Sequence, residues 1–315
     1  MQLPLPLDPQ LKAALAKVDE IAASLPPAQP GIEGVRRQAE LGRRYWNEGG
    51  PTPAQYTEQT VDLPIGQVRA AVYVPQRVDR PLPAFVYLHG GGFKLGTLHS
   101  NDRQMREIAQ AWGGIVVSIG YPLVPEAVFP TAIDVTAEFL RWLHVHGTQW
   151  GIDGDRLSVG GTSAGASIAF GAMVTLQGAA WLRAGVGIAG AFSDDITLPS
   201  MIAFTGVGLF PERMAIAAMF DEYAPLPEHR RDPRLDLLAA PRQVFPPVFL
   251  AVAELDTLRD ASLRLAAHLS ASPQACELRQ YPGMSHLFFG LGREVEQAAQ
   301  CVQDVSAFLA RQLPA

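Results

Sequence analysis

The chain has 315 residues, of which 48% are hydrophobic, and its 31 acidic and 25 basic side chains give a net charge of −6. This length and composition fit one large globular domain or a core with a small satellite, and the negative charge argues against nucleic acid as a partner. No apolar run approaches the ~18 residues of a membrane span, and the two cysteines, Cys276 and Cys301, are too few for a disulfide framework.

The N-terminal section, residues 1–50, is predicted to be helical and lies outside any strand pattern. It starts without the basic stretch and apolar run of a secretory signal peptide, so we expect a cytoplasmic protein. Apolar spacing predicts a helix over residues 11–24. A proline-rich break follows, and residues 32–48 are predicted to form a second, more charged helix.

Strand-like runs begin after this second helix. Residues 55–64 and 66–75 are separated by a turn and predict a hairpin. Residues 84–89 ("AFVYLH") and 114–121 ("GIVVSIGY") are short, solid apolar runs, as expected of strands buried on both faces.

Beyond residue 121 predicted helices and strands alternate. Helices are predicted over 131–146, from Ala164, over 260–271 and over 294–313, and strands over 156–161, 184–192, 246–255 and 276–283. This alternation predicts an α/β protein with a mostly parallel sheet.

Two sections depart from this alternation and are candidates for a cap over one end of the sheet. They are residues 1–50 and residues 193–223, which leave 51–192 and 224–315 as the two parts of the main domain. Residues 193–223 are rich in Met, Phe and Gly. So apolar a segment should fold onto the sheet, either as a roof over the site or simply as core.

The segment "SVGGTSAGAS", residues 158–167, contains a G-x-S-x-G motif around Ser163. It lies between a predicted strand and a predicted helix, which is the context in which this motif presents a nucleophilic serine. Small flanking residues let the neighbouring backbone pack closely while the hydroxyl stands clear. We therefore predict Ser163 as the nucleophile.

A serine nucleophile needs a base, and the base needs an acid that orients it. His286 lies in a loop between the last predicted strand and the last helix, whereas the other histidines lie on helical or charged stretches or in the loop after the glycine run. Asp256 directly follows a buried strand, where sites form in parallel sheets. Glu254 and Asp260 are nearby rivals. The order Ser163, Asp256, His286 is the order expected of α/β-hydrolases.

The run "HGGG", residues 89–92, explains how the charge formed by such an attack could be stabilised. We predict that the backbone N–H groups of Gly91, Gly92 and Ala164 hold the oxyanion. A side chain on the substrate-facing glycines would obstruct that approach. His89 and Gly90 are predicted to shape the loop, with His89 as a hydrogen-bonding residue and not a catalyst.

These motifs together resemble the α/β-hydrolases of the hormone-sensitive lipase-like group, the bacterial family IV esterases, in the branch with GTSAG. The resemblance runs from about residue 83 to the C-terminus and rests on "HGGGF" at 89–93, "YPLVPEAVFP" at 121–130, "GTSAG" at 161–165, "DTLRD" at 256–260 and "GMSHLF" at 283–288. It implies an α/β-hydrolase fold with a helical cap, hydrolysis of short-to-medium acyl esters, and no cofactor or metal.

The sequence departs from the family pattern at several positions. Thr162 stands where many members have Asp before the serine, which removes one charge next to the nucleophile. Tyr121-Pro122 replaces the usual Tyr-Arg, so an arginine is missing from the segment that braces the oxyanion loop. In the acid motif Thr257 replaces Pro and Ala261 replaces Glu.

The expected protein is a carboxylesterase that acts on a small-molecule ester through an acyl-enzyme, as a monomer or a homodimer. Two other interpretations stay open. One is an amidase or peptidase with the same catalytic residues, and the other is a hydrolase fold that serves as a non-catalytic receptor.

Overall fold

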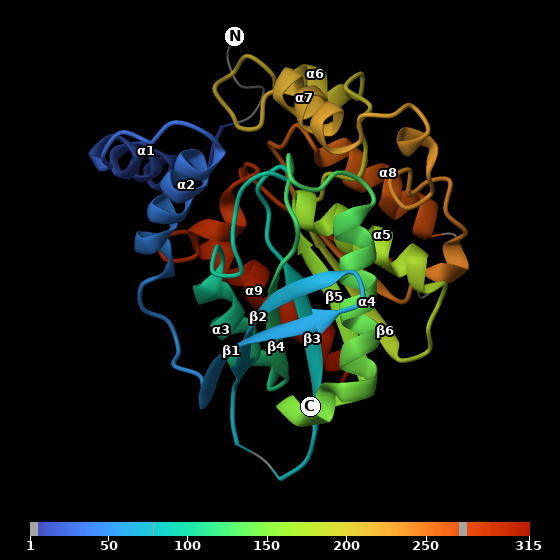
Figure 1. The fold of residues 1–315 in the computed structure, drawn as a ribbon. Coiled ribbons are helices and arrows are strands. Elements are labelled where there is room, and N and C mark those ends of the chain that lie inside the picture. The colour runs from blue at the N-terminus through green and yellow to red at the C-terminus, as the bar shows by residue number, and fades with distance from the viewer. Residues whose placement is uncertain (1–5, 78, 271–275) are drawn as a thin grey trace.

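The computed structural model describes residues 6–77, 79–270 and 276–315. Its centre is an eight-stranded sheet with the order β1-β2-β4-β3-β5-β6-β7-β8 (Figure 1). The strands are β1 (Gln55–Leu63), β2 (Gly66–Val74), β3 (Leu82–Leu88), β4 (Ile115–Gly120), β5 (Ile152–Thr162), β6 (Leu182–Ile188), β7 (Val248–Ala253) and β8 (Cys276–Tyr281). Strand β2 pairs antiparallel with both β1 and β4, and all the remaining pairs are parallel.

Helices cover both faces of this sheet. They are α1 (Pro9–Ser24), α2 (Ile32–Asn47), α3 (Asp102–Trp112), α4 (Thr131–His146), α5 (Ala164–Leu176), α6 (Pro199–Ala203), α7 (Arg213–Tyr223), α8 (Arg259–Leu269) and α9 (Glu296–Gln312). Side chains of α4, α5 and α8 share one buried apolar cluster, and those of α3 and α9 share the other. In β3, Val86 belongs to the first cluster while Phe85 and Tyr87 belong to the second, because successive side chains of a strand point to opposite faces.

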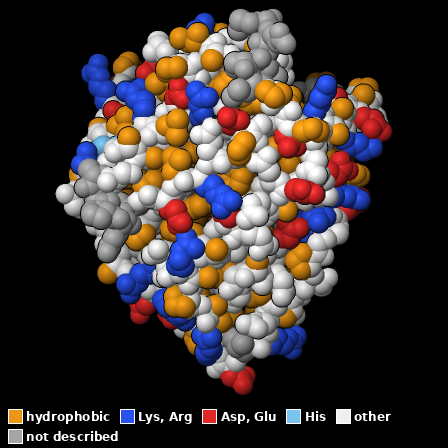
Figure 2. Space-filling view, turned by 180° about the vertical axis from the view of Figure 1, so that it is seen from behind, with side chains coloured by type: hydrophobic (Ala, Val, Ile, Leu, Met, Phe, Trp, Pro, Cys, Tyr) orange, Lys and Arg blue, Asp and Glu red, His pale blue; other side chains and the backbone are white. Residues whose placement is uncertain are grey.

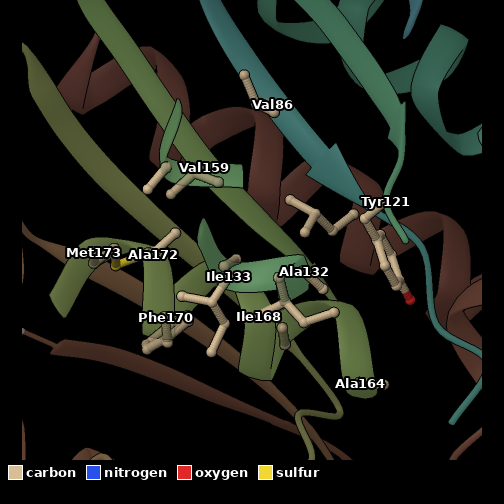
Figure 3. Close-up of a cluster of buried hydrophobic side chains, with 14 of the residues drawn as sticks. Val86, Tyr121, Ala132, Ile133, Val159, Ala164, Ile168, Phe170, Ala172 and Met173 are labelled. Atoms are coloured by element: carbon tan, nitrogen blue, oxygen red, sulfur yellow. The ribbon is translucent and has the colours of Figure 1, made fainter. Parts of the chain in front are cut away.

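Helix α5 anchors the end of β5 against the sheet. Figure 3 shows Ile168 of α5 and Ile133 of α4 gathered beside Val86 and Val159 of the neighbouring strands. Nearly every residue of α5 is buried, so this helix is apolar all round, as expected of a helix enclosed by its neighbours. Its N-terminus, where Ser163 lies, is thereby held in a fixed position.

Helices α1 and α2 are built into the main core. Leu11, Ala14 and Trp46 are buried in the same cluster as α3 and α9. The backbone N–H of Asp8 donates to the carbonyl of Gly283 across 3.1 Å, which ties the start of the chain to the loop after β8. The N-terminal helices therefore contribute to the packing of the whole molecule.

The segment 193–223 contains α6 and α7 and is anchored to two loops at the ends of strands. In Figure 1 α6 and α7 (gold) lie with α1 and α2 (blue) at the end of the molecule opposite the C-terminus. Ser200 Oγ donates to the carbonyl of Thr257 across 2.8 Å, and Thr257 Oγ1 donates to the carbonyl of Pro211 across 2.8 Å. The ring of Tyr223 stacks on Phe93 with 3.8 Å between the centroids.

The α/β class and the mostly parallel sheet predicted from the sequence are confirmed. Helix α3 is not among the predicted elements, although Met105, Ile108 and Trp112 recur on one face of it at helical spacing. The strand predicted over 184–192 ends at Ile188, because Ala189 turns into the left-handed region with φ of 45°. Strand β5 is longer than predicted and begins at Ile152.

The surface carries charges of both signs. Figure 2 shows Lys and Arg interspersed with Asp and Glu over the face seen from behind. Of the helices in the described part of the chain, none combines the length and apolar character that crossing a membrane requires.

Candidate active site

Ser163 occupies the turn between β5 and α5 in a backbone conformation that residues other than glycine rarely adopt. Its φ is 55° and its ψ is −122°. A Cβ atom at Gly161 would stand 2.5 Å from the carbonyl oxygen of Leu88, and one at Gly165 only 2.3 Å from the same oxygen. The two glycines of the motif are therefore required because the end of β3 packs directly against the turn.

The structure brings the three predicted catalytic residues together. His286 Nε2 lies 2.9 Å from Ser163 Oγ, and His286 Nδ1 lies 2.8 Å from Asp256 Oδ2. All three side chains are buried, with exposed fractions of 7% for Ser163, 5% for His286 and 1% for Asp256. A carboxylate can only accept, so Nδ1 donates to Asp256 and leaves Nε2 to accept the serine proton.

The two rival carboxylates have other partners. Glu254 accepts a hydrogen bond from the backbone N–H of Gly283 across 2.7 Å, in the turn that precedes His286. Asp260 accepts from the N–H of Ser200 across 2.9 Å and holds α6. Asp256 is therefore the carboxylate in contact with the histidine, and its second oxygen accepts from the N–H of Leu258 across 2.9 Å.

The glycine run lies beside the serine. A Cβ at Gly90 would stand 3.3 Å from Ser163 Cβ, so this glycine is the one that packs against the nucleophile. A Cβ at Gly91, where φ is 134°, would stand 2.1 Å from the carbonyl oxygen of Leu95. At Gly91 a side chain would therefore already collide with the loop itself, whether or not it also obstructed the substrate.

The three predicted oxyanion donors are backbone N–H groups at or beside the cavity. Gly91 and Gly92 line the cavity that contains Ser163, and Ala164 is the first residue of α5. Over the described ranges, the N–H groups of these three residues donate to no protein acceptor. Such N–H groups are available to a ligand, as at other helix N-termini.

His89 braces the glycine run, as predicted, and is buried. Its Nδ1 donates to the carbonyl of Gly90 across 2.9 Å, and its ring stacks on Tyr121 at 4.4 Å. Tyr121 in turn donates its hydroxyl to the carbonyl of His89 across 2.8 Å. Burial lowers the pKa of His89 to about 4, so the ring is neutral at neutral pH.

Arg36 of α2 joins the loop after the glycine run to the segment that follows β4. Arg36 donates to the carbonyl of Lys94 across 3.1 Å and to the carbonyl of Val124 across 2.9 Å, and it pairs with Glu126. These contacts join α2, the loop after the glycine run and the segment after β4. Sequence reasoning missed Arg36, because its partners lie far away along the chain.

Ser163 and His286 open into a cavity of about 280 Å³. Its wall is mostly apolar, and both sections that depart from the strand–helix alternation contribute to it. From α2 come Ala39 and Arg43, and from the segment 193–223 come Phe210, Pro211, Ile216 and Met219. Both candidate cap sections therefore border the cavity next to the serine.

Thr162, the residue before the serine, belongs to a chain of hydrogen bonds with Tyr87 and Asn101. Tyr87 lies 2.9 Å from Thr162 Oγ1, and its hydroxyl donates to Asn101 Oδ1 across 2.9 Å. Thr162 and Asn101 both line the cavity. Sequence reasoning did not identify Asn101 or Arg43, since no local pattern distinguishes them from other polar residues on a helix or in a loop.

Metal-ligating side chains do not gather in the described residues, where no three His, Cys, Asp or Glu side chains lie close enough together to hold an ion. The groups that the site provides for a reaction are a hydroxyl, an imidazole, a carboxylate and backbone N–H donors.

Residues 85–290 match the model of a protein family described as alpha/beta hydrolase fold. The chain belongs to this family. The matched range contains the glycine run, the serine turn, Asp256 and His286 of this α/β-hydrolase.

Solved structures of esterases are similar to this α/β-hydrolase over nearly its whole length. The hyperthermophilic esterase of the archaeon Pyrobaculum calidifontis is 26% identical, with 97% of this chain and 98% of that chain covered and a TM-score of 0.87. An ester-hydrolase from the metagenome of Lake Arreo, complexed with a derivative of bipyridine phosphonate, is 28% identical, with 97% and 98% covered and a TM-score of 0.87. A thermostable carboxylesterase from a metagenomic library is 26% identical, with 91% and 99% covered and a TM-score of 0.86.

Proposed function

We propose that this α/β-hydrolase is a carboxylesterase that cleaves esters through an acyl-enzyme on Ser163. The observation that carries the proposal is the buried Ser163–His286–Asp256 hydrogen-bond chain, at 2.9 and 2.8 Å. The family match and the esterase neighbours support the same class of reaction. The motifs support placing the chain in the hormone-sensitive lipase-like group.

The first half-reaction begins with attack of Ser163 Oγ on the ester carbonyl while His286 Nε2 accepts the hydroxyl proton. The carbonyl oxygen becomes an oxyanion and is held by the N–H groups of Gly91, Gly92 and Ala164. Asp256 stabilises the imidazolium. The tetrahedral intermediate then collapses, His286 donates its proton to the leaving alkoxide, and the alcohol departs.

The second half-reaction repeats these roles with water. His286 removes a proton from the water, which attacks the acyl carbonyl, and the same N–H groups hold the second oxyanion. Collapse releases the carboxylic acid, and the proton returns to Ser163 Oγ. No cofactor is needed for either step.

The finite volume of the cavity should limit the length of the acyl chain that the enzyme accepts. We propose that residues 1–50 and 193–223 act as a cap that closes over the acyl group, because α2 and the segment around Phe210 and Met219 both line the wall. Each buried methylene adds up to about 0.8 kcal/mol until the cavity is full. Short and medium acyl chains are the substrates that a cavity of about 280 Å³ suits.

The experiment that tests the proposal compares p-nitrophenyl butyrate with the matched butyryl p-nitroanilide. We expect turnover of the ester, and Ser163→Ala should lower kcat by about 10⁴-fold or more. Ser158→Ala is the matched control, because Ser158 is a buried serine of β5, the strand that leads to Ser163, and its hydroxyl donates to the carbonyl of Ala84. It should keep kcat within a few-fold.

The same experiment decides between the alternatives. Faster cleavage of the anilide than of the ester would favour an amidase or peptidase. Absence of turnover on any ester, with intact folding, would favour a non-catalytic receptor. Turnover by Ser163→Ala within tenfold of the wild type would show that another group is the nucleophile.

A further inference from the structure

Arg43 is a cation in a cavity wall that is otherwise without fixed charge. Among the residues that the structure describes, it is the only Arg or Lys that lines the cavity around Ser163 and His286, and no Asp or Glu lines it. Thr162, which is uncharged, stands in the wall next to Ser163. The side chains that line this wall therefore include one fixed positive charge and no fixed negative charge among the described residues.

The guanidinium of Arg43 is held by neutral acceptors. Its Nε donates to the carbonyl of Ser100 across 2.9 Å, and its Nη2 donates to the carbonyl of Gly290 across 2.7 Å. These two bonds use two of its five N–H groups. Burial lowers the pKa of Arg43 to about 10, so the group is still charged at neutral pH.

Nearby carboxylates do not neutralise Arg43. Arg43 and Ser100 also border an outer cavity of about 330 Å³, whose wall includes Glu40, Glu48 and Asp102. Each of these acids pairs with a different arginine, Glu40 with Arg37, Glu48 with Arg293 and Asp102 with Arg106. Within the described ranges Arg43 itself has no ion-pair partner. A partly buried cation without a counter-ion is costly unless a ligand supplies one.

Two further features would help the Arg43 guanidinium to bind a ligand. A Cβ at Gly290 would stand 2.9 Å from both terminal nitrogens of Arg43, so the chain leaves room for the group in the loop that follows His286. Asn101 lies in the same cavity wall, and its Oδ1 accepts from Tyr87. That bond leaves the Asn101 amide nitrogen as a second donor, with no acceptor among the described residues.

We propose that Arg43, aided by Asn101, binds a carboxylate of the substrate, so that the enzyme prefers esters that carry a second, ionised carboxyl group. Half-esters of short dicarboxylic acids and acyl esters of short hydroxy acids have this chemistry. A guanidinium fits the geometry of a carboxylate and binds it through paired hydrogen bonds. This inference rests on the proposed esterase function and names its substrate class.

The test uses two pairs of substrates that differ only in whether the distal group is a carboxylate or a carboxamide of similar size. On the acyl side, monoethyl glutarate is compared with its carboxamide, ethyl 4-carbamoylbutanoate. On the alcohol side, 4-acetoxybutanoate is compared with 4-acetoxybutanamide. We expect the wild type to have the higher kcat/KM for the carboxylate in at least one pair, and Arg43→Gln to lower that carboxylate-to-amide ratio about 10- to 100-fold.

The carboxylate-to-amide ratio of kcat/KM distinguishes binding of the substrate carboxylate by Arg43 from a purely structural role of Arg43. Loss of the two backbone bonds of Arg43 would lower kcat/KM for both members of a pair equally and leave the ratio unchanged. Arg43→Lys keeps the charge and should retain part of the preference. Arg44→Gln, at the exposed neighbour on α2, should leave the ratio within about twofold. An unchanged ratio in Arg43→Gln, or a wild type that prefers the amide in both pairs, overturns the proposal.

Binding provides a readout that does not depend on turnover. Calorimetry with the Ser163→Ala protein should detect binding of glutarate. The affinity for glutarate should fall about tenfold or more in the double variant that also carries Arg43→Gln. If the wild type hydrolysed no ester but glutarate still bound through Arg43, the proposed function would fail and the carboxylate site would stand. If Arg43→Gln did not fold, stronger binding of glutarate than of glutaramide, which carries no carboxylate, by the Ser163→Ala protein would still support the site, and equal binding would overturn it.

Discussion

Ser163 is held in a backbone region that costs a side chain about 1–3 kcal/mol. Its φ of 55° persists because Gly161 and Gly165 let the turn pack against the end of β3. The motif predicts both the turn and the position of the serine. It does not predict that Thr162 joins a hydrogen-bond chain to Asn101, because that chain depends on a tyrosine from another strand.

His89 is the residue with the clearest expected pH effect on stability. Its pKa is lowered to about 4 by burial, whereas a histidine in the unfolded chain titrates near ~6.5. Between these values the unfolded state binds a proton that the folded state does not, so stability is full above pH ~6.5 and falls as the pH drops toward ~4. The expected loss is about 3 kcal/mol.

Urea unfolding of the wild type and of His89→Asn at several pH values between about 7 and 4 measures this effect. The wild type should lose about 3 kcal/mol more than the variant over this range, since all other groups contribute to both proteins. Parallel curves for the two proteins would mean that His89 takes up a proton in the folded state without penalty.

At the scale of elements, most helices and strands are predicted correctly from the sequence, because the spacing of apolar residues along the chain indicates which face of each element is buried. Solid apolar runs give β3, β4 and β7, and the strand–helix alternation gives the parallel sheet. The spacing of the apolar residues in α3 also indicates a helix, although α3 follows a long loop. What could not be read is which side chains of α2 face the site, since that depends on how α2 docks against loops more than fifty residues away.

Arg36 is the expected link between α2 and the oxyanion loop. Arg36→Ala removes two hydrogen bonds from a charged donor to backbone carbonyls, together with the pair to Glu126. It should lower the free energy of unfolding by about 2 kcal/mol and reduce kcat on a short ester.

Arg37 provides the matched control for that change. It is one residue further along α2, is 61% exposed at its side chain and pairs only with Glu40, 3.3 Å away. Arg37→Ala should change stability by less than about 0.5 kcal/mol and leave kcat unaltered. Equal effects of the two substitutions would show that Arg36 is not a brace.

At the scale of the whole molecule, the N-terminal helices serve the core and the site together. Trp46 is buried among α3 and α9, while Ala39 and Arg43 line the cavity. Deleting the N-terminal section would therefore expose core as well as open the cavity. Substrate length is the cleaner probe of whether the two cap sections enclose the acyl chain.

We expect kcat/KM on p-nitrophenyl esters to peak at about four to eight acyl carbons and to drop at least about tenfold by about sixteen. The reason is that a filled cavity cannot accept further methylenes without overpacking. A rate that rises up to about sixteen carbons, and jumps when the substrate forms an emulsion, would contradict the closed cavity and indicate a lipase with a mobile lid.

The central claim is that Ser163 is a nucleophile activated by His286, and covalent labelling tests it most directly. The protein is treated with an activated organophosphonate, and the adduct is located by mass spectrometry of the intact chain and its peptides. We predict one phosphonyl group per chain, on the peptide that contains Ser163, with loss of esterase activity in step and no adduct in Ser163→Ala. An adduct on another residue, or full activity after complete labelling of Ser163, would contradict the account.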